Sequence, residues 1–346
     1  MIPDPLGPLL SRPVVVAPMA GGPTTPALVA VAAGAGALGF LAAGYQTADA
    51  MRAAIASVRA AAAGPFGVNL FVPGSPAADP AVTARYVSSL RADASRVGAV
   101  LAEPAWDDDG WTAKLDTLLT DPPPVVSFTF GCPDAGVLSD FRRAGSVTVV
   151  TVTSPAEAQQ AATAGAACLC VQGAEAGAHQ GTFGNEGPAT AGTALLALVA
   201  QVARVTDVPL IAAGGIMTAA GAAAALAAGA AAVQCGTAFL RCPESGAHPV
   251  HKAALASGRF TGTTLTRAFS GRPARGLVNQ FIRDHPDAPA AYPQVNNATR
   301  PLRAAAARQG DADRMSLWAG TGFRAATDQP AGEVISQLTA VAPGER

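Results

Sequence analysis

Charged side chains are scarce in this chain of 346 residues, because Asp, Glu, Lys and Arg together make up 14% and the formal net charge is −1. This balance gives no electrostatic reason to bind nucleic acid or an anionic membrane surface. Disorder is excluded too, since 50% of the residues are hydrophobic and disordered chains combine low hydrophobicity with high net charge. The composition favours a globular protein with a large core.

The sequence also lacks the spacings of a metal centre or a disulfide framework. Its five cysteines include no Cys-x-x-Cys pair, and no His-Glu-x-x-His motif occurs. Reduced, buried thiols in a cytoplasmic protein are expected, with no metal site. The first ten residues have no basic start, so no signal peptide is expected. The uncharged stretch 208–240 is long enough to raise a membrane helix, but proline and glycine interrupt it, which excludes one.

Eight short apolar runs recur between alanine-rich stretches, and most are continuous in Val, Ile, Leu and Phe, as in parallel strands buried on both faces. They are 14–18, 38–42, 66–71, 125–130, 147–152, 168–172, 209–213 and 232–236. Helices are expected at 27–33, 48–62, 156–164 and 219–228, each after a Ser or Thr cap. Left-handed glycines are expected to end the helices at Gly34, Gly64, Gly165 and Gly229.

This order of elements predicts an α/β fold, a (β/α)8 barrel with a C-terminal capping or lid region, and leaves a doubly wound parallel sheet as the alternative. We expect residues 1–241 to form the barrel and 242–325 to form capping helices and loops over its mouth. Residues 326–346 are expected to form a helix that packs back on the barrel. The sequence Gly34-Ala-Gly36-Ala-Leu-Gly39 spells a dinucleotide-binding pattern, but a helix precedes it and a strand follows, the reverse of what such a site needs.

Catalytic and binding residues of a barrel lie on the loops after the strands. After the seventh and eighth runs, Gly214-Gly215 and Gly236-Thr237 offer backbone N–H groups, and the helix after Thr218 adds its positive end. These loops predict a phosphate site without Lys or Arg. The alternative is that the glycine pairs form tight turns that bind no ligand. Asn69 and Gln172 either hydrogen-bond a flat heterocycle or satisfy local backbone groups.

His179 lies in a glycine-rich loop directly after the sixth run. Histidine titrates near neutral pH, so His179 is either a proton-transfer group or a structural histidine. The other three histidines, His248, His251 and His285, lie in polar stretches with proline and are expected at the surface. Because no nucleophile triad or metal cluster occurs, the redox chemistry is expected to belong to a cofactor.

These features together resemble the nitronate monooxygenases, in particular their bacterial class. The matching segments include VVVAPMAGG (14–22), FGVNLFVPG (66–74), CVQGAEAGAHQGTF (170–183), PLIAAGGI (209–216), VQCGTAFL (233–240) and YPQVNNATRPLRAAA (292–306). The resemblance implies an FMN-dependent TIM barrel with the phosphate on Gly215, Gly236 and Thr237. The other cofactor-binding residues that it implies are Ala17, Pro18, Met19, Ala20, Asn69, Gln172, Gly177, Gly214 and Gln234.

The family oxidises alkyl nitronates with O2 to a carbonyl compound and nitrite, and the toxic propionate 3-nitronate is a usual substrate. The resemblance makes His179 the catalytic residue, which takes a proton from a neutral nitroalkane or, when charged, holds the nitronate anion. Gly21, Tyr45 and Tyr292 are expected to join His179 at the substrate. A monomer or homodimer is expected.

The chain departs from the family pattern at several positions. Ala178 and Gln180 flank His179 where a glycine and an arginine are common, and the stretch after Tyr292 lacks a histidine. Thr321 replaces a glutamine. These changes are expected to affect substrate choice more than FMN binding.

Two alternatives remain. One is an FMN-dependent enoyl-ACP reductase that uses NAD(P)H, with Arg267, Arg272 and Arg275 on a surface for the acidic carrier protein. The other is a flavin-binding protein without turnover.

Overall fold

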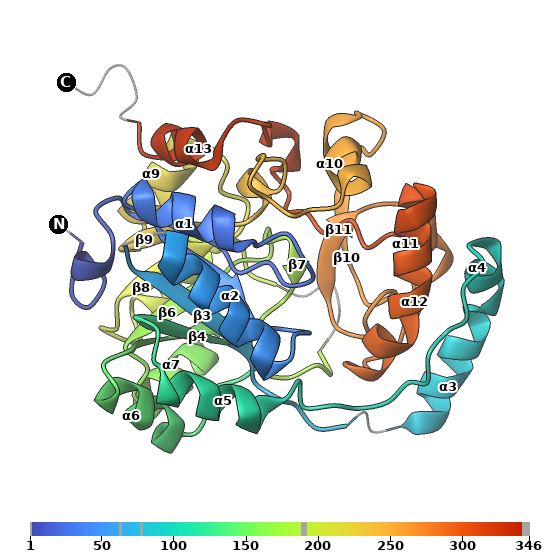
Figure 1. Cartoon of the computed structure of the whole chain (residues 1–346), viewed down its shortest axis with the longest axis horizontal. Helices are drawn as coiled ribbons and strands as arrows, with labels where there is room; N and C mark the ends of the chain where they lie inside the picture. The colour runs from blue at the N-terminus through green and yellow to red at the C-terminus, as the bar shows by residue number, and fades with distance from the viewer. Residues whose placement is uncertain (1, 62–63, 77–78, 188–191, 341–346) are drawn as a thin grey trace.

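The structure, a computed structural model, describes residues 2–61, 64–76, 79–187 and 192–340. Eight parallel strands form a closed barrel in the order β1-β2-β3-β4-β5-β6-β8-β9 (Figure 1). Closure comes from β1, which pairs with β9 at Val14↔Val233. The (β/α)8 prediction is therefore confirmed, and the doubly wound sheet is excluded. The barrel strands are Val14–Val16, Leu38–Ala42, Phe66–Phe71, Val125–Thr129, Val147–Val152, Cys168–Gln172, Leu210–Ala213 and Ala232–Cys235.

Helices connect the strands and cover the outside of the barrel, as the alanine-rich stretches predict. They are α1 (Pro26–Gly34), α2 (Ala48–Ala61), α5 (Trp111–Thr120), α6 (Ala135–Arg143), α7 (Pro155–Ala164), α8 (Leu195–Val202) and α9 (Ala219–Ala227). The predicted end of α2 at Ala62 lies outside the described residues. The hydroxyls of Thr25, Ser154 and Thr218 accept backbone N–H groups three residues ahead, so these caps form as predicted.

The prediction of left-handed glycines at the ends of helices is confirmed at two of the four positions. Gly165 and Gly229 have φ of 98° and 113°, whereas Gly34 and Gly64 do not adopt positive φ. After α1 the left-handed residue is Gly36 instead, with φ of 76°. Gly39 packs so closely on α1 that an added Cβ would lie 2.9 Å from the Cα of Val29. The glycine pattern at 34–39 therefore ends a helix and allows close helix–strand packing.

The amino-terminal end of the barrel is filled with apolar side chains. Val15, Phe40 and Ile211 are buried in its interior together with Leu6 and Leu10 from the N-terminal segment. This end therefore has no room for a ligand, and the opening is at the carboxyl ends of the strands.

A second apolar core lies beside this opening and consists mainly of residues 240–323. It contains the helices α10 (Pro249–Ala256), α11 (Gln280–Asp284) and α12 (Gln294–Gln309). It also contains an antiparallel sheet of β10 (Thr263–Thr266), β11 (Ala274–Leu277) and β7 (Ala178–His179). The expectation of helices and loops alone is therefore wrong, because β10 and β11 pair as neighbours and β11 obtains its second partner, β7, from about 95 residues earlier in the sequence.

The long connection between β3 and β4 contributes to this second core. Its helices α3 (Pro80–Ser89) and α4 (Arg91–Arg96) lie beside α11 and α12 rather than on the barrel (Figure 1). Leu90, Ala94 and Val97 are buried in the second core. We call this core, including α3 and α4, the cap. The predicted boundaries at residues 241 and 325 stay predictions.

The last described helix, α13 (Ala331–Leu338), contacts α1 and α9 on the outside of the barrel. Val334 and Ile335 are buried in the barrel's outer core. Residues 341–346 of the predicted C-terminal segment lie outside the described part. No helix of the described chain has the length and apolar character to cross a membrane.

Candidate active site

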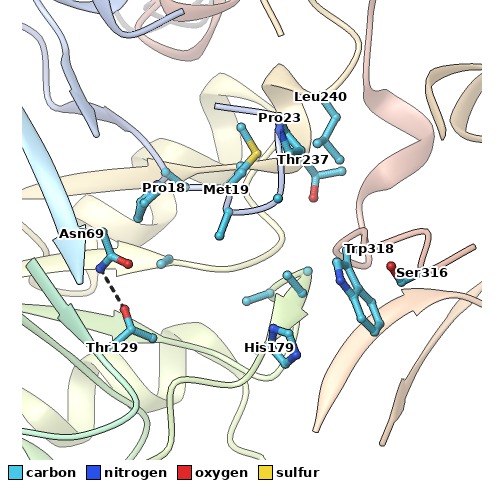
Figure 2. Close-up of a pocket in the computed structure, with 18 of the residues that line it drawn as sticks. Pro18, Met19, Pro23, Asn69, Thr129, His179, Thr237, Leu240, Ser316 and Trp318 are labelled. Carbon is cyan, nitrogen blue, oxygen red and sulfur yellow. Dashed lines mark hydrogen bonds between the residues drawn. The ribbon is translucent and has the colours of Figure 1, made fainter. Parts of the chain in front are cut away.

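A cavity of about 520 Å³ lies at the carboxyl ends of the barrel strands and is closed on one side by the cap. Figure 2 shows the barrel residues Pro18, Met19 and Asn69 facing it, with His179 and Trp318 near the cap. Every predicted cofactor and substrate residue lines it except Tyr292, which contacts two residues that do. The structure therefore gathers the predicted residues in one place, and their individual roles stay predictions.

The glycine loops after β8 and β9 form one part of the cavity wall. Gly214 and Gly215 have φ of 131° and 69°, which side chains rarely allow. A Cβ on Gly215 would lie 2.9 Å from the Cβ of Glu175. The loop thus presents backbone rather than side chains to the cavity, as an anion site built from N–H groups requires. Thr237 lines the cavity and accepts the Gly320 N–H at 3.0 Å.

Polar side chains from neighbouring strands form the floor. Asn69 is buried, and its Nδ2 donates to Ser127 Oγ at 2.9 Å and to Thr129 Oγ1 at 3.0 Å (Figure 2). Gln172 accepts the Gly181 N–H at 2.7 Å and donates to the His179 carbonyl at 3.1 Å. The alternative left open for Gln172, an amide that satisfies local backbone, is thus realised. The same bonds position the segment that carries His179.

His179 is held by its backbone and by one ring nitrogen. Strand β7 pairs with β11 at Ala274↔His179, and Nε2 lies 2.9 Å from Ser270 Oγ. We assign the Ser270 hydroxyl as the donor to the Arg272 carbonyl at 3.1 Å, which makes its oxygen the acceptor of His179 Nε2–H. The remaining ring nitrogen, Nδ1, is therefore the unprotonated one.

The pKa of His179 is lowered to about 3, first because burial disfavours the imidazolium and second because Arg272 and Arg303 are close. At neutral pH the ring is therefore neutral. A neutral ring is compatible with a proton acceptor, and both roles that the resemblance implies for His179 stay predictions.

Three aromatic rings pack around the partly exposed His179. Its ring centroid lies 5.7 Å from Phe130, 5.6 Å from Tyr292 and 5.5 Å from Trp318. Arg272 is 5% exposed and lies over the Phe130 ring at 4.1 Å. Burial lowers its pKa to about 10, so it stays cationic.

Two arginines that sequence reasoning missed supply positive charge to the cavity. Asn296, Arg300, Arg303, Ala304 and Ala307 all line it, and their spacing places them on one face of α12. Arg303 Nη2 donates to the backbone carbonyl and to the side-chain Oδ1 of Asn296, each at 2.9 Å. Its pKa is lowered to about 10 by burial, so it too remains charged. The signal was present as the helical spacing of 292–306, but only the fold shows which face is used.

The histidine prediction is wrong for His251, which is 7% exposed and lines the cavity. Burial lowers its pKa to about 4. His285 is also not a surface residue, since its Nε2 lies 2.9 Å from Asp93 of α4. Both lie within the cap, whose core was not recognisable from the polar sequence around them. His248 is exposed, as predicted.

The role predicted for the three arginines changes as well. Arg272 is buried rather than on a surface for an acidic carrier protein, and Arg275 and Arg267 donate to backbone carbonyls. Glu175 accepts the Leu195 N–H at the start of α8, so it secures the loop. The described residues contain no group of three or more His, Cys, Asp or Glu that could hold a metal ion.

Comparisons with known proteins agree with this geometry. The model of the family "Nitronate monooxygenase" matches residues 6–340. The chain is 37% identical to a probable nitronate monooxygenase of Bacillus subtilis over 92% of both chains. It is 39% identical to a nitronate monooxygenase of Pseudomonas aeruginosa over 95% of both chains.

This chain belongs to the nitronate monooxygenase family. It is accordingly an oxidoreductase of a flavin-dependent family. The solved structure of nitroalkane oxidase from Streptomyces ansochromogenes superimposes with a TM-score of 0.93 at 50% identity, over 95% of both chains. FabK from Thermotoga maritima gives a TM-score of 0.71 at 27% identity, over 96% of this chain and 93% of the other.

The departures from the nitronate monooxygenase pattern lie in different surroundings. Gln180 is buried, and its carbonyl accepts from Arg272 Nε at 3.2 Å, so a guanidinium from the segment before β11 lies beside the position that lost its arginine. Thr321 Oγ1 lies 3.1 Å from the place of a Cβ on Gly215. Thr321 therefore borders the glycine loop and not the arginine face of α12.

Proposed function

We propose that this protein binds FMN and oxidises alkyl nitronates, such as propionate 3-nitronate, with O2 to a carbonyl compound and nitrite. The observation that carries the proposal is a single cavity in which backbone-lined glycine loops, a neutral histidine and the arginine face of α12 meet. Family membership and the likeness to the Streptomyces nitroalkane oxidase support the same class of substrate.

The residues present fit FMN. A phosphate would be held by backbone N–H groups at Gly215 and Gly236 and by the Thr237 hydroxyl, and at Gly215 an added side chain would crowd the loop. The flavin ring would lie against Ala17–Ala20 and the amide floor at Asn69. FMN would supply the redox chemistry, accepting electrons from the substrate and passing them to O2.

The chain's own residues bind and orient the substrate. Arg303 remains charged at neutral pH and would attract the nitronate anion, with the exposed Arg300 at the same helix face. His179 offers Nδ1 as an acceptor for a proton from a neutral nitroalkane. The aromatic rings around His179 would give the substrate an apolar surface to pack against.

The test begins with the purified protein, which is expected to be yellow with one FMN per chain. Under anaerobic conditions, propionate 3-nitronate should bleach or shift the flavin spectrum, and readmitted O2 should restore it with release of nitrite. Colourless protein that cannot be reconstituted would exclude any flavin function. Reduction by NADH instead would favour the reductase, and a flavin spectrum that responds to neither compound would favour binding without turnover.

A further inference from the structure

Lys114 is one of only two lysines in the chain, and it is buried in α5 with 1% exposure. Its Nζ donates to Asp109 Oδ2 at 2.6 Å and to the Ala43 carbonyl at 2.9 Å. An ion pair that is taken out of water is costly and is weak evidence of stabilisation by itself. Neither Lys114 nor Asp109 lines the cavity. Their pairing therefore needs another explanation.

The second oxygen of Asp109 accepts the backbone N–H of Tyr45 at 2.8 Å. Both residues have left-handed backbones, with φ of 66° at Tyr45 and 56° at Asp109. Such conformations are uncommon without glycine and persist where the surroundings hold them. At Gly44, an added Cβ would lie 2.2 Å from the Phe71 ring. The turn that carries Tyr45 is thus held from two sides.

This turn directs the Tyr45 side chain into the cavity wall. The Tyr45 hydroxyl lies 3.2 Å from the Tyr292 hydroxyl, and the Tyr292 ring lies 5.6 Å from His179. The Tyr45 ring also packs edge-on against Phe71 at 5.4 Å. Contacts therefore run without interruption from Lys114 through Asp109, Tyr45 and Tyr292 to His179.

We propose that Lys114 is a positioning residue for the substrate end of the cavity: its ion pair with Asp109 holds the Tyr45 turn, and Tyr45 holds Tyr292 beside His179. Lys114 does not contact the substrate. The effect on catalysis rests on the proposed function, whereas the effect on the two tyrosines does not. The proposal also explains why the long connection between β3 and β4 returns to the barrel through α5 with a buried charge.

The first test reads the tyrosines directly. The chain has three, Tyr45, Tyr86 and Tyr292, so protein labelled with 3-fluorotyrosine gives three ¹⁹F signals that Tyr→Phe variants assign. Lys114→Met should shift the signals of Tyr45 and Tyr292 and leave that of Tyr86, whose hydroxyl bonds Ala268 in the cap. Unmoved Tyr45 and Tyr292 signals would overturn the proposal.

The matched control is the other lysine. Lys252 Nζ donates to the Cys242 carbonyl at 2.8 Å, so it is also a partly buried lysine bonded to backbone, but it has no contact with Tyr45. Lys252→Met should leave the Tyr45 signal in place. A shift of this signal as large as that in Lys114→Met would mean that any lost lysine disturbs the cavity, and the proposal would fail.

The second test is a double-mutant cycle with propionate 3-nitronate. Lys114→Met should lower kcat/KM about tenfold, mainly through KM, because the substrate end is displaced while FMN stays bound. In a Tyr45→Ala background the same change should cost less than twofold, because Lys114 acts through Tyr45. Equal losses in both backgrounds would show a general structural role and overturn the proposal.

A second variant guards against misfolding, since Lys114→Met leaves the Asp109 carboxylate buried without its cation. Lys114→Met/Asp109→Asn removes both charges and keeps an acceptor for the Tyr45 N–H. It should show the same ¹⁹F shifts and the same loss of kcat/KM. If the unmodified protein turns over no nitronate, the proposed function fails while the ¹⁹F result still decides the role of Lys114.

Discussion

The barrel and the cap line the two walls of the cavity with different kinds of residue. Among the described residues, the barrel wall contains no Asp, Glu, Lys or Arg and consists of glycine loops, amides, hydroxyls and apolar side chains. The cap wall contributes Arg300 and Arg303, two histidines and Trp318. An uncharged wall with exposed backbone suits a phosphate-bearing cofactor, whereas a wall with two cations suits an anionic substrate.

Backbone conformation determines the barrel wall, whereas the charge state of side chains determines the cap wall. Barrel loops obtain their shape from positive φ at Gly214 and Gly215, where a side chain would crowd the backbone. In the cap, burial decides the charge state of the side chains. It lowers the pKa of Arg303 only to about 10, so this residue stays charged, and it lowers the pKa of His251 to about 4, so this residue is neutral at pH 7. His179 joins the two regions, because it follows a barrel strand and pairs with β11 of the cap.

The largest effect is expected at this junction. His179→Asn should lower turnover by about 10²–10⁴-fold, the range of a lost general base, while the FMN content stays at one per chain. Steady-state kinetics with a nitroalkane and flavin absorbance measure both. His285→Asn, which alters a histidine bonded to Asp93 outside the cavity, should leave turnover within twofold. Unchanged turnover in His179→Asn would remove this residue from the mechanism.

The next largest effect tests the charge of the cap wall. Arg303→Met should raise KM for an anionic nitronate roughly 10–100-fold, as expected for a lost charge-assisted hydrogen bond of about 1.5–3 kcal/mol. KM for the neutral nitroalkane should change less than threefold. Arg308→Met alters an exposed arginine at the end of the same helix and should change neither value. Equal rises for both substrates would contradict an electrostatic role.

A smaller effect tests the backbone of the barrel wall. Gly215→Ala should weaken FMN binding about tenfold, because φ of 69° and a contact of 2.9 Å with Glu175 force the loop to shift. Quenching of flavin fluorescence gives the Kd. Gly258→Ala imposes the same backbone conformation, φ of 68°, at a position with no atom within 4 Å. Gly258→Ala should lower stability without weakening FMN binding. If Gly215→Ala and Gly258→Ala weaken FMN binding equally, the loop at Gly215 has no special role in holding FMN.

The smallest effect concerns pH. His251 has a folded pKa of about 4, below the unfolded value near 6.5, so the unfolded chain takes up the proton first as the pH falls. Its contribution to stability is complete above pH 6.5 and declines toward pH 4 by about 1.4 kcal/mol per unit. His179 acts in the same direction, reduced by its partial exposure. Urea unfolding measured from pH 7 to pH 4 gives the free energy of unfolding at each pH, and this free energy should fall less steeply with pH in His251→Asn than in the unmodified protein. An equally steep fall in both proteins would refute the role of His251.

The barrel was predictable because its signals are local. Continuous apolar runs placed the strands within two residues, and Thr25, Ser154 and Thr218 cap helices where their sequence suggests. Loops after such strands necessarily meet at one end of a barrel, so the order of elements along the chain was enough to group the residues on them. The resemblance to the nitronate monooxygenases then added a chemistry that composition and spacing did not contain.

The cap was not predictable in the same way. Its strands β10 and β11 are short, and the pairing of β11 with β7 joins residues about 95 positions apart. His251 is buried by side chains that come from distant segments, so its local sequence suggested the surface. Lys114 has the sequence context of an ordinary helix residue five positions after Asp109, and only the fold brings Ala43 to it.

The sequence by itself determined the barrel, the glycine loops and the position of His179 after β6, because periodicity, capping and backbone freedom depend on neighbours in the chain. Only the tertiary structure decided which charges reach the cavity and in which state. Burial sets the protonation of His179 and His251, and the face that α12 turns inward makes Arg303 part of the cavity wall. Burial and facing depend on residues far apart in sequence, and a pattern of neighbours cannot specify them.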